Sequence, residues 1–519
     1  MLAAEKATWF GAHFLASAAE TGSRTALVFE DRSWTYTELD LLIRQAVRCL
    51  RAVGVGKGDR VVMQGVPRPE AISALFAVTR MGAILVPLHP QITENELAVI
   101  CEETSPRAII ADSSFVGHRL ADAGAALLAW DELCAGDRST GEHVREAPDG
   151  SDVAIIPFTS GTSGRPKGVA LTHDNLYWSM VNGFAGLPME DREVALIATP
   201  LAHVAVLGGL PQYTWARRGT VVLAPRFDPG LFIDLVRDHK VTTAFAVPAM
   251  LTLLVRHPRF HSADMDSLRW VLAGGAPAVS TTATRFDDRG IHIVNSYGLT
   301  ESCAGVTYAA GEDVADHPTS VGRPMPHVEL RVMDDKGVPA PAEAVGEIWL
   351  RGPSIAASYW TRAGLLPVAD PDGWFHTGDR GRFDARGRLE VVGRVKDTII
   401  TGGENVDPAE VENILAGLPG VLDVAVCGLP DPVWGEIVTA FVVVGTREVS
   451  LDDIRKYVEG KLTKHKWPRQ LFLVEMLPRG ATGKIQRQKL IDLACHSTSA
   501  GRDRQPSPSS SAPAPRSNP

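Results

Sequence analysis

Helical and strand patterns alternate along the first half of the chain, and this alternation limits the possible folds more than any other feature. Apolar residues recur at helical spacing over 39–53, 71–81, 231–239 and 249–257. Short apolar runs suited to strands lie between them, at 60–63, 83–87, 194–199, 243–247 and 268–273. Strands separated by helices pair mostly in parallel, with the helices on the faces of the sheet. We therefore predict an α/β protein.

The pattern changes at about residue 320. Short strand patterns between glycine turns then follow, at 328–333, 346–351 and 388–392. They predict a β-barrel-like subdomain. After Arg394 a second α/β pattern begins, with strand patterns at 424–426 and 439–444 and a helix pattern at 451–462. Residues 496–519 are rich in Ser, Pro and Arg and lack apolar periodicity, so we expect a disordered tail there.

Length, charge and cysteine usage exclude several classes of protein. With 519 residues, 45% of them hydrophobic, the chain is too long for one compact domain. A net charge of −9 argues against a general nucleic-acid binder. The six cysteines are scattered without a C-x-x-C pair, which favours reduced thiols over disulfides or a zinc site. No signal-peptide pattern and no run of about 18 apolar residues occurs, so we expect a cytoplasmic protein without a membrane span.

Residues 158–169, with the sequence FTSGTSGRPKGV, form the most informative local motif. The apolar run 153–158 has the pattern of a buried strand ending at Thr159, so the motif is a loop that leaves a strand. Its glycines let backbone N–H groups converge on an anion, and its hydroxyls and Lys167 add donors and positive charge. We interpret the loop as a polyphosphate cradle. It is not a Walker A loop, because no Gly-Lys-Ser/Thr closes it.

Further chemical groups follow at strand ends and turns. Residues 273–277 (AGGAP) follow a strand and would let a flat ring approach the backbone. Residues 295–302 (NSYGLTES) bring together an aromatic ring, hydroxyls and a carboxylate, and 377–379 (TGD) places an acid suited to a diol after a tight turn. Residues 393–397 are a charged junction, and 478–484 form a loop with one lysine. Each motif alone fits an ordinary turn or strand end, but the ordered set does not.

This ordered set resembles the adenylate-forming superfamily of acyl-CoA synthetases, non-ribosomal adenylation domains and beetle luciferases. The resemblance covers about residues 5–495, and 402–412 (GGENVDPAEVE) is most similar to fatty-acyl and aryl CoA ligases. It implies an N-terminal domain at 1–393, with two α/β sheet subdomains and the β-barrel-like subdomain. It also implies a hinge at 394–397 and a small mobile α+β lid domain at 398–495. The implied reaction is ATP-dependent conversion of a carboxylic acid to acyl-AMP and pyrophosphate, then thioester formation with CoA.

The resemblance assigns nucleotide-binding roles to matching positions. The implied ATP-binding residues are Thr159, Ser160, Gly161, Thr162, Ser163, Gly164, Lys167, Gly275, Ala276, Pro277, Asn295, Ser296, Tyr297, Gly298, Thr300, Asp379, Arg394 and Lys484. The loop 159–167 would hold the β- and γ-phosphates, and 275–277 with 295–297 would hold adenine. Thr300 would touch the α-phosphate, and Glu301 would ligate Mg²⁺. Asp379, helped by Arg394, would bind the ribose hydroxyls.

Catalytic, acyl-binding and CoA-binding roles are implied in the same way. The implied catalytic residues are Lys484, Thr300, Glu301, His203 and Lys396. Lys484 would bridge the substrate carboxylate and the α-phosphate. The small domain would then rotate about Lys396, so that Gly402 and Gly403 face the pantetheine chain in the second step. The implied acyl-pocket residues are His203, Val204, Leu207, Gly208, Val247, Met250, Gly274, Leu299, Cys303 and Ala304.

The implied pocket walls are mostly apolar or small, which bears on the substrate. None offers a charge for a second carboxylate or for an ammonium group. A hydrophobic monocarboxylic acid is therefore expected: a fatty acid, an aryl acid or a bulky biosynthetic acid. We expect a monomer or homodimer.

Three alternatives bear on function. An amino-acid adenylation domain would carry an aspartate beside the gate position, where this chain has Val204. An acyl-AMP ligase that loads an acyl carrier protein stays open, because residues 447–490 hold 11 Lys/Arg and 5 Asp/Glu, a surface suited to CoA phosphates or to an acidic carrier. A non-catalytic nucleotide-binding relative would be expected to lack Glu301 or Lys484, and both are present.

Overall fold

The computed structural model describes residues 10–112, 124–133, 148–160, 166–275, 280–311, 313–314, 317, 319–402, 404–445, 449–480 and 485–502. The chain divides into two compact units between Val395 and Lys396. This junction falls within the segment predicted as a hinge, and rotation about it stays a prediction. The predicted α/β class is confirmed, with a large N-terminal unit and a smaller C-terminal unit.

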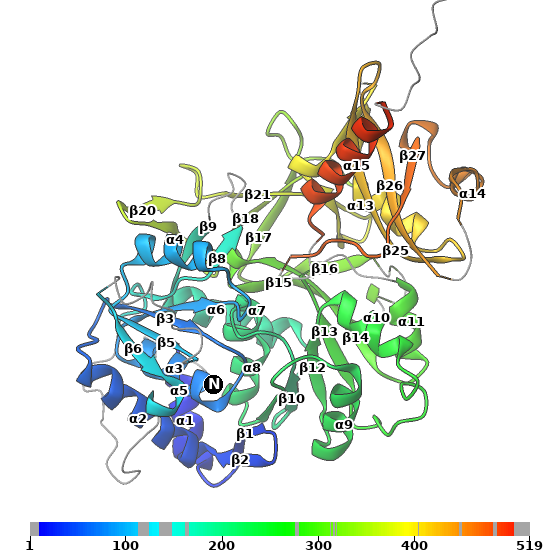
Figure 1. Ribbon diagram of the computed structural model, residues 1–519. Helices are drawn as coiled ribbons and strands as arrows, with labels where there is room; N and C mark the ends of the chain where they lie inside the picture. Colours follow the sequence, from blue (N-terminus) through cyan, green and yellow to red (C-terminus); the bar gives the residue numbers. More distant parts are fainter. Residues whose placement is uncertain are drawn as a thin grey trace, which may run out of the picture. The chain divides into compact units, whose positions relative to one another are not determined.

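The larger unit contains a 13-stranded sheet (Figure 1). Its strand order is β17-β18-β21-β22-β16-β15-β14-β13-β12-β10-β11-β1-β2. The parallel part consists of β1 (Thr25–Phe29), β10 (Val194–Ile197), β11 (Thr220–Leu223), β12 (Thr243–Ala246), β13 (Trp270–Ala273) and β14 (His292–Leu299). Strand β2 (Arg32–Thr35) pairs antiparallel with β1 at one edge. The parallel pairing is the arrangement that alternating strands and helices predict.

Alternate residues of β10 face different cores, because successive side chains of a strand point to opposite faces. Ala195 and Ile197 join the largest buried cluster, whereas Leu196 belongs to a second cluster on the other face. The helices of that second cluster are α9 (Pro229–His239), α10 (Pro248–Arg256) and α11 (Ser280–Asp287) (Figure 1). Burial on both faces explains why this strand reads as a continuous apolar run.

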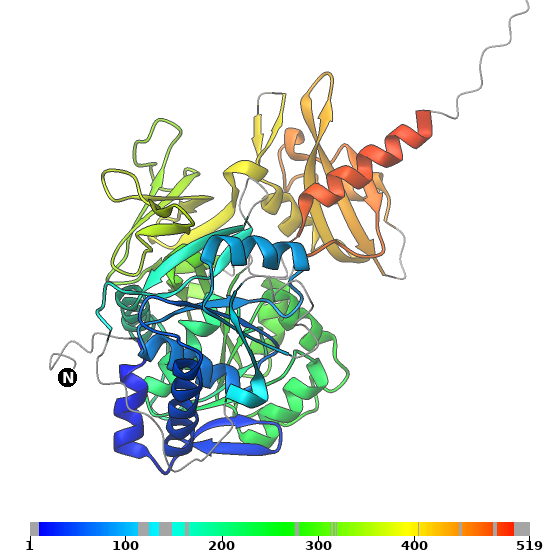
Figure 2. The same ribbon diagram turned by 60° about the vertical axis from the view of Figure 1, so that its left-hand side comes forward.

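The second sheet of this unit has the strand order β20-β19-β9-β7-β4-β3-β5-β6, with β8 beside β9. Its N-terminal strands are β3 (Arg60–Gln64), β4 (Ile84–Leu88), β5 (Ala108–Ala111) and β6 (Ala126–Ala129). The largest buried cluster joins the two sheets through α1 (Ala12–Thr21), α2 (Tyr36–Ala52), α3 (Pro69–Arg80), α6 (His173–Gly186) and α8 (Leu210–Ala216). Helices α1 and α2 lie side by side in both views (Figures 1 and 2).

The apolar run 153–158 forms two strands, not the single strand that its pattern predicts. Strand β7 (Val153–Ile155) pairs with β4 and β9, whereas β8 (Phe158–Ser160) pairs with β9 (Pro166–Thr172) alone. Pro157 lies between them and has no N–H to donate to a ladder. The break turns the chain toward the phosphate loop.

Helix starts follow the capping chemistry of the sequence. At α2, the Thr35 hydroxyl accepts from the Glu38 N–H, and the Glu38 carboxylate accepts from the Thr35 N–H. Thr172 and Asn175 form the same reciprocal pair at the start of α6. The Asn175 amide also donates to the Pro353 carbonyl at 2.9 Å. The cap that begins the helix after the phosphate loop therefore also holds a distant segment in place.

The β-rich segment predicted from residue 320 extends both sheets. Strands β16 (Ser320–Pro324), β17 (Glu329–Met333), β18 (Gly346–Arg351), β21 (Phe375–Phe383) and β22 (Leu389–Arg394) continue the first sheet beyond β15 (Ala304–Ala309). Strands β19 (Ser358–Thr361) and β20 (Gly364–Pro367) extend the second, and β19 pairs antiparallel with β9. Pairing onto existing edges satisfies backbone groups that would otherwise stay unpaired.

The C-terminal unit contains a five-stranded sheet. Its strands are β23 (Ile399–Thr401), β24 (Glu404–Val406), β25 (Val421–Asp431), β26 (Gly435–Val444) and β27 (Gln470–Leu473). Helices α13 (Pro408–Leu415) and α14 (Leu451–Val458) pack on one face of this sheet, and α15 (Arg487–Arg502) packs on the other (Figure 2). None of the helices in the described ranges is long and apolar enough to cross a membrane.

Helix α15 requires a correction to the predicted tail. It continues to Arg502, so the expectation of disorder is wrong for 496–502. An existing helix gains one hydrogen bond for each residue added, so it can extend into a sequence without apolar periodicity. The remainder of the predicted tail, 503–519, lies outside the described residues.

His173, at the start of α6, is expected to make stability depend on pH. It is 1% exposed, and its Nδ1 accepts from the Phe10 N–H at 3.0 Å. Burial lowers the pKa of His173 from 6.5 to about 4, because protonation would place a charge in the core and remove that acceptor. The unfolded chain binds the proton more readily, so stability should fall as pH drops from about 6.5 to about 4, by about 2–3 kcal/mol.

Urea unfolding at pH 7 and pH 5 checks this expectation. His173→Gln keeps a hydrogen-bond acceptor but does not titrate, so its stability should change less between the two pH values than that of the wild type. An equal loss of stability in both proteins would show that His173 is not responsible.

Candidate active site

The phosphate loop is held at the end of a short hairpin. Strands β8 and β9 pair with Thr159 opposite Lys167 and Ser160 opposite Pro166. Lys167 is exposed, and its Nζ lies 5.5 Å from the centre of the Tyr359 ring. The predicted loop residues Gly161, Thr162, Ser163 and Gly164 lie outside the described residues, as does the side chain of Ser160. The structure thus fixes both ends of the predicted cradle.

Thr300 and Glu301 sit in a tight turn between two sheet strands. The turn is the 3₁₀ segment η2 (Thr300–Ser302), which joins β14 to β15. Gly298 permits the two strands to approach there, because a Cβ at this position would overlap the Ala304 carbonyl oxygen. Both side chains are half-buried. The turn therefore presents a hydroxyl and a carboxylate together, as the sequence predicts.

The backbone beyond this turn adopts conformations that are rare for residues other than glycine. Cys303 has a φ of 60° and Ala304 a φ of 132°. The Ser302 hydroxyl donates to the Ala304 carbonyl at 2.8 Å and accepts from the Leu299 N–H at 2.9 Å. The Ser179 hydroxyl donates to the Cys303 carbonyl at 3.0 Å. These hydrogen bonds hold a strained turn in place, and strained backbone is common at functional sites.

A tyrosine that the sequence motifs do not single out contacts Glu301. The Tyr359 hydroxyl on β19 donates to Glu301 Oε1 at 3.1 Å. The backbone of the same region is tied to the turn, since the Ala356 N–H donates to the Glu301 carbonyl at 2.7 Å. Tyr359 lies 58 residues from Glu301 in the chain, so local patterns give no sign of this contact.

Asp379, Arg394 and Tyr297 meet in one cluster, in which Asp379 and Tyr297 are buried and Arg394 is half-buried. The Tyr297 hydroxyl donates to Asp379 Oδ2 at 2.9 Å, and Arg394 Nε lies 3.1 Å from Asp379 Oδ1. Burial, together with the charge of Asp379, raises the pKa of Tyr297 well above its usual value of 10, so the phenol remains a donor. The Asp379 N–H donates to the Thr377 hydroxyl at 3.0 Å. The structure thus brings Tyr297, predicted for adenine, together with Asp379 and Arg394, predicted for the ribose.

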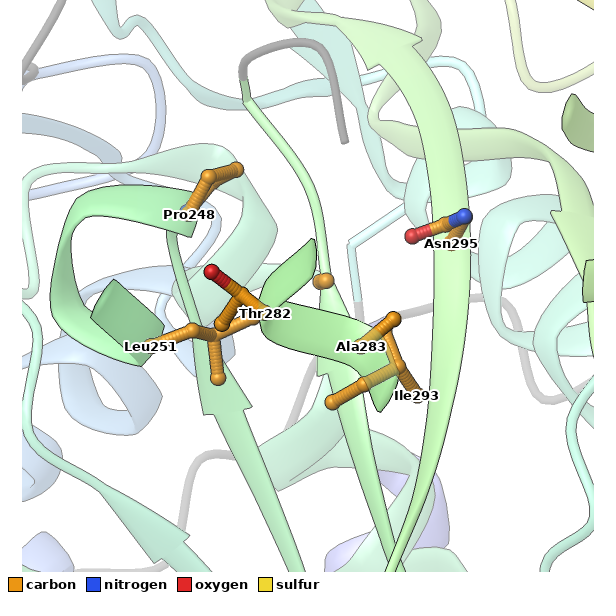
Figure 3. Close-up of a pocket in the computed structure, with 7 residues that line it drawn as sticks. Pro248, Leu251, Thr282, Ala283, Ile293 and Asn295 are labelled. Atoms are coloured by element: carbon orange, nitrogen blue, oxygen red, sulfur yellow. The ribbon is translucent and has the colours of Figure 1, made fainter. Parts of the chain in front are cut away.

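The predicted adenine residues lie just after β13 and within β14. Asn295 is buried, and its amide donates to the Ser320 carbonyl at 3.2 Å, whereas Ser296 is half-buried. Gly275 is exposed with a φ of +84°, and Ala276 and Pro277 lie outside the described residues. A small cavity beside Asn295 is lined by Pro248, Leu251, Ala273, Thr282, Ala283 and Ile293 (Figure 3). Its wall is mostly apolar, with Thr282 and Asn295 as the polar residues.

The predicted acyl-pocket residues differ in exposure. His203, Val247 and Leu299 are half-buried. The others are buried, namely Val204, Leu207, Gly208, Met250, Gly274, Cys303 and Ala304. Gly208 is closely packed, because a Cβ there would meet Leu176 Cδ2 and the Cys303 carbonyl. The first three residues therefore keep part of their surface accessible, and the predicted acyl-binding roles of all ten stay predictions.

His203 has a second histidine beside it. The rings of His203 and His89 are 6.2 Å apart between centroids. His89 Nδ1 accepts from the Gln91 N–H at 3.1 Å, and burial lowers the pKa of His89. His89 is therefore neutral near pH 7 and carries its proton on Nε2. The sequence motifs do not include His89.

The site residues of the C-terminal unit are only partly described. Lys396 is exposed on the 3₁₀ segment η3 (Val395–Asp397). Gly402 has a φ of +61°, and a Cβ there would meet the ring of Trp434, so a side chain at this position would be strained and crowded. Gly403 and Lys484 lie outside the described residues. Their predicted roles stay predictions.

Comparison with known proteins decides the family. The model of the AMP-binding enzyme family matches residues 14–360, and that of the AMP-binding enzyme C-terminal domain matches 410–484. The chain belongs to the AMP-binding enzyme family. The predicted resemblance is thereby confirmed. The first match spans the β8–β9 hairpin, the turn that contains Glu301, and Tyr359.

Relatives of this AMP-binding enzyme include several CoA ligases. Feruloyl-CoA synthase from Amycolatopsis is 38% identical over 89% of this chain and 94% of that protein. The long-chain-fatty-acid–CoA ligase FadD13 of Mycobacterium tuberculosis is 33% identical over 89% of this chain and 93% of that protein. The prediction of an AMP-forming acid–thiol ligase is confirmed.

Solved structures agree with this assignment. The o-succinylbenzoate CoA synthetase of Bacillus subtilis, in complex with ATP and a magnesium ion, has a TM-score of 0.81 at 30% identity, over 92% of this chain and 98% of that chain. The same enzyme with its acyl-adenylate intermediate has a TM-score of 0.82 at 31% identity, over 92% and 97% of the two chains.

Proposed function

We propose that this AMP-binding enzyme uses ATP to activate a hydrophobic monocarboxylic acid and then transfers the acyl group to CoA. The first step yields acyl-AMP and pyrophosphate, and the second yields the thioester and AMP. The observation that carries the proposal is the shared contact of Glu301 and Lys167 with Tyr359. Through Tyr359, this contact links Glu301, a carboxylate suited to a metal, with Lys167, a lysine of the β8–β9 hairpin suited to phosphate.

A magnesium ion fits this arrangement. Within the described ranges, no group of three or more His, Cys, Asp or Glu side chains could hold a metal. Mg²⁺ commonly keeps several waters and takes only one or two carboxylates in addition to substrate phosphates, so Glu301 alone is a sufficient protein ligand. When bound, the ion would neutralise charge on the phosphate oxygens.

The protein's own side chains would position the reactants. A carboxylate approaches a triphosphate against like-charge repulsion, which Lys167 and the predicted Lys484 would offset. Asp379, held by Tyr297 and Arg394, would orient the ribose. In-line displacement at phosphorus needs little covalent help from protein, so fixed positions and charges supply most of the rate enhancement.

The acid is proposed to be hydrophobic because the candidate pocket offers no partner for a second charge. The half-buried residues Val247 and Leu299 are apolar, and His203 is the polar group beside them. Two proteins similar to this chain are named for a feruloyl group and for a long-chain fatty acid. A hydrophobic acid would bury its apolar part in the pocket and leave its carboxylate at His203.

The acyl acceptor is proposed to be CoA, and an acyl carrier protein is the second candidate. The basic segment 447–490 favours a phosphate-bearing or acidic partner, and both acceptors satisfy that condition. The names of the relatives favour CoA. Thioester formation with free CoA, compared with formation on a carrier protein, decides between the two.

Pyrophosphate release tests the proposed function. Purified protein with ATP, Mg²⁺ and a panel of fatty, cinnamic-type and dicarboxylic acids should release pyrophosphate fastest with the hydrophobic monocarboxylic acids. Addition of CoA should convert the acyl-AMP to a thioester and AMP. Formation of ADP and orthophosphate would contradict adenylation, and a preference for dicarboxylic acids would contradict the proposed pocket.

A further inference from the structure

Tyr359 occupies a position between two groups of the proposed ATP site. Its side chain is half-buried, and its ring packs against the largest buried cluster of the protein. The hydroxyl donates to Glu301 Oε1 at 3.1 Å. In the part of the chain that the structure describes, no other side chain hydrogen-bonds the Glu301 carboxylate. Tyr359 therefore holds Oε1 of Glu301, and no described side chain hydrogen-bonds Oε2.

The ring of the same tyrosine faces the phosphate-loop lysine. Lys167 Nζ lies 5.5 Å from the ring centroid, within the range of a cation–π contact. Lys167 is exposed on β9, where a lysine side chain would otherwise sample many rotamers. The contact favours rotamers that keep the ammonium near the Tyr359 ring.

The backbone around Tyr359 is held on two sides. On one side, β19 pairs with β9, with Tyr359 opposite Val169. On the other, the Ala356 N–H donates to the Glu301 carbonyl at 2.7 Å, and the Asn175 amide donates to the Ile355 carbonyl at 3.0 Å. A side chain on a doubly anchored strand can position its neighbours, because its own backbone has little freedom to move.

We propose that Tyr359 is a positioning residue for magnesium-bound ATP, orienting Glu301 through its hydroxyl and Lys167 through its ring. The inference rests on the proposed function, since it assigns the metal to Glu301 and the phosphates to the Lys167 loop. Groups that hydrogen-bond a metal ligand fix its orientation, and their loss typically lowers metal affinity or activity about 10- to 100-fold. The two contacts have separable effects: the hydroxyl acts on the metal and the ring acts on the lysine.

Tyr359→Phe tests the hydroxyl, because it retains the ring. Isothermal titration should show ATP binding with Mg²⁺ weakened about tenfold, while ATP binding in EDTA and AMP binding change less than about twofold. The Mg²⁺ concentration for half-maximal pyrophosphate release should rise about tenfold. Tyr359→Leu, which also removes the ring, should weaken ATP binding in EDTA about two- to fivefold and leave AMP binding unchanged.

Tyr457→Phe is the matched control. Tyr457 lies on α14 in the C-terminal unit and has Lys461 Nζ over its ring at 3.2 Å, so it is also a tyrosine with a lysine partner. Its Mg²⁺ dependence should equal that of the wild type. Thermal unfolding of each variant checks that it is folded.

The outcomes separate this inference from the proposed function. If the wild type releases pyrophosphate and Tyr359→Phe has the same Mg²⁺ dependence, the positioning role is refuted and the proposed function stands. Parallel loss of AMP and magnesium–ATP binding in Tyr359→Phe would also overturn it, because AMP does not depend on the metal or on the loop. Absence of pyrophosphate release in the wild type with every acid would overturn the proposed function itself.

Discussion

Replacing Lys484 with alanine should lower the rate of acyl-AMP formation about 10²- to 10³-fold and leave thioester formation from supplied acyl-AMP nearly unchanged. Lys484 is predicted to act only where negative charge gathers at the α-phosphate. A single charged, desolvated contact of this kind supplies about 3–4 kcal/mol of transition-state stabilisation. Pyrophosphate release measures the first step, and CoA-thioester formation from synthetic acyl-AMP measures the second.

Two further variants sharpen this test. Lys336→Ala removes an exposed lysine that follows β17, outside the basic segment 447–490, and should leave both steps unchanged. Lys396→Pro should have the reverse effect of Lys484→Ala, since proline fixes φ at the segment predicted to turn between steps. If Lys484→Ala slows both steps equally and Lys396→Pro slows neither, the two-orientation mechanism is wrong for this protein.

Replacing Asp379 with asparagine should weaken binding of ATP and AMP alike, by about 100-fold. The Asp379 carboxylate accepts from the Tyr297 hydroxyl and pairs with Arg394, and it is predicted to bind the ribose hydroxyls. Hydrogen bonds to a charged group contribute about 1.5–3 kcal/mol each, and asparagine keeps the shape without the charge. Because ribose is bound in both ground and transition states, KM for ATP should rise more than kcat falls.

Titration calorimetry with AMP and with ATP measures this effect directly. Asp372→Asn, in the exposed turn before β21, is a control that should bind both nucleotides as the wild type does. Unchanged AMP affinity in Asp379→Asn, with a large fall in kcat, would show that Asp379 acts on the phosphates or the acid and not on the ribose. Equal effects of both substitutions would indicate a general effect of losing negative charge.

Local patterns in the sequence determine much of the fold. Apolar runs bounded by glycine and proline predict the strands around Ala195 and Val271, because burial on both faces requires apolar side chains throughout. Reciprocal Thr–Glu and Thr–Asn pairs mark helix starts, because capping uses neighbouring residues only. The break between β7 and β8 at Pro157 also follows from the local sequence, because proline has no N–H to donate to a strand ladder.

The sequence also predicts the chemical groups of the site but not how they are held. Glycines, hydroxyls and Lys167 in one loop, and Thr300 with Glu301 in one turn, form motifs because each set acts together over a few residues. Thr377–Asp379 and Arg394 are likewise recognisable by their order along the chain. The contacts of Asp379 with Tyr297 and Arg394 depend on the pairing of β21 with β22 and on the place of β14 in the same sheet, which spacing alone does not give.

Only the tertiary structure decides which distant side chains hold these chemical groups in place. Tyr359 reaches Glu301 and Lys167 because β19 pairs with β9, although β19 follows that strand by more than a hundred residues. Ser179 reaches the Cys303 carbonyl because α6 packs against β15. A motif consists of residues that lie close together in the chain and act together. A supporting side chain can come from any part of the chain, because tertiary packing brings it to the site. The sequence by itself therefore determined the family and its chemical groups, and the fold alone determined how those groups are oriented, because long-range pairing leaves no local periodicity to read.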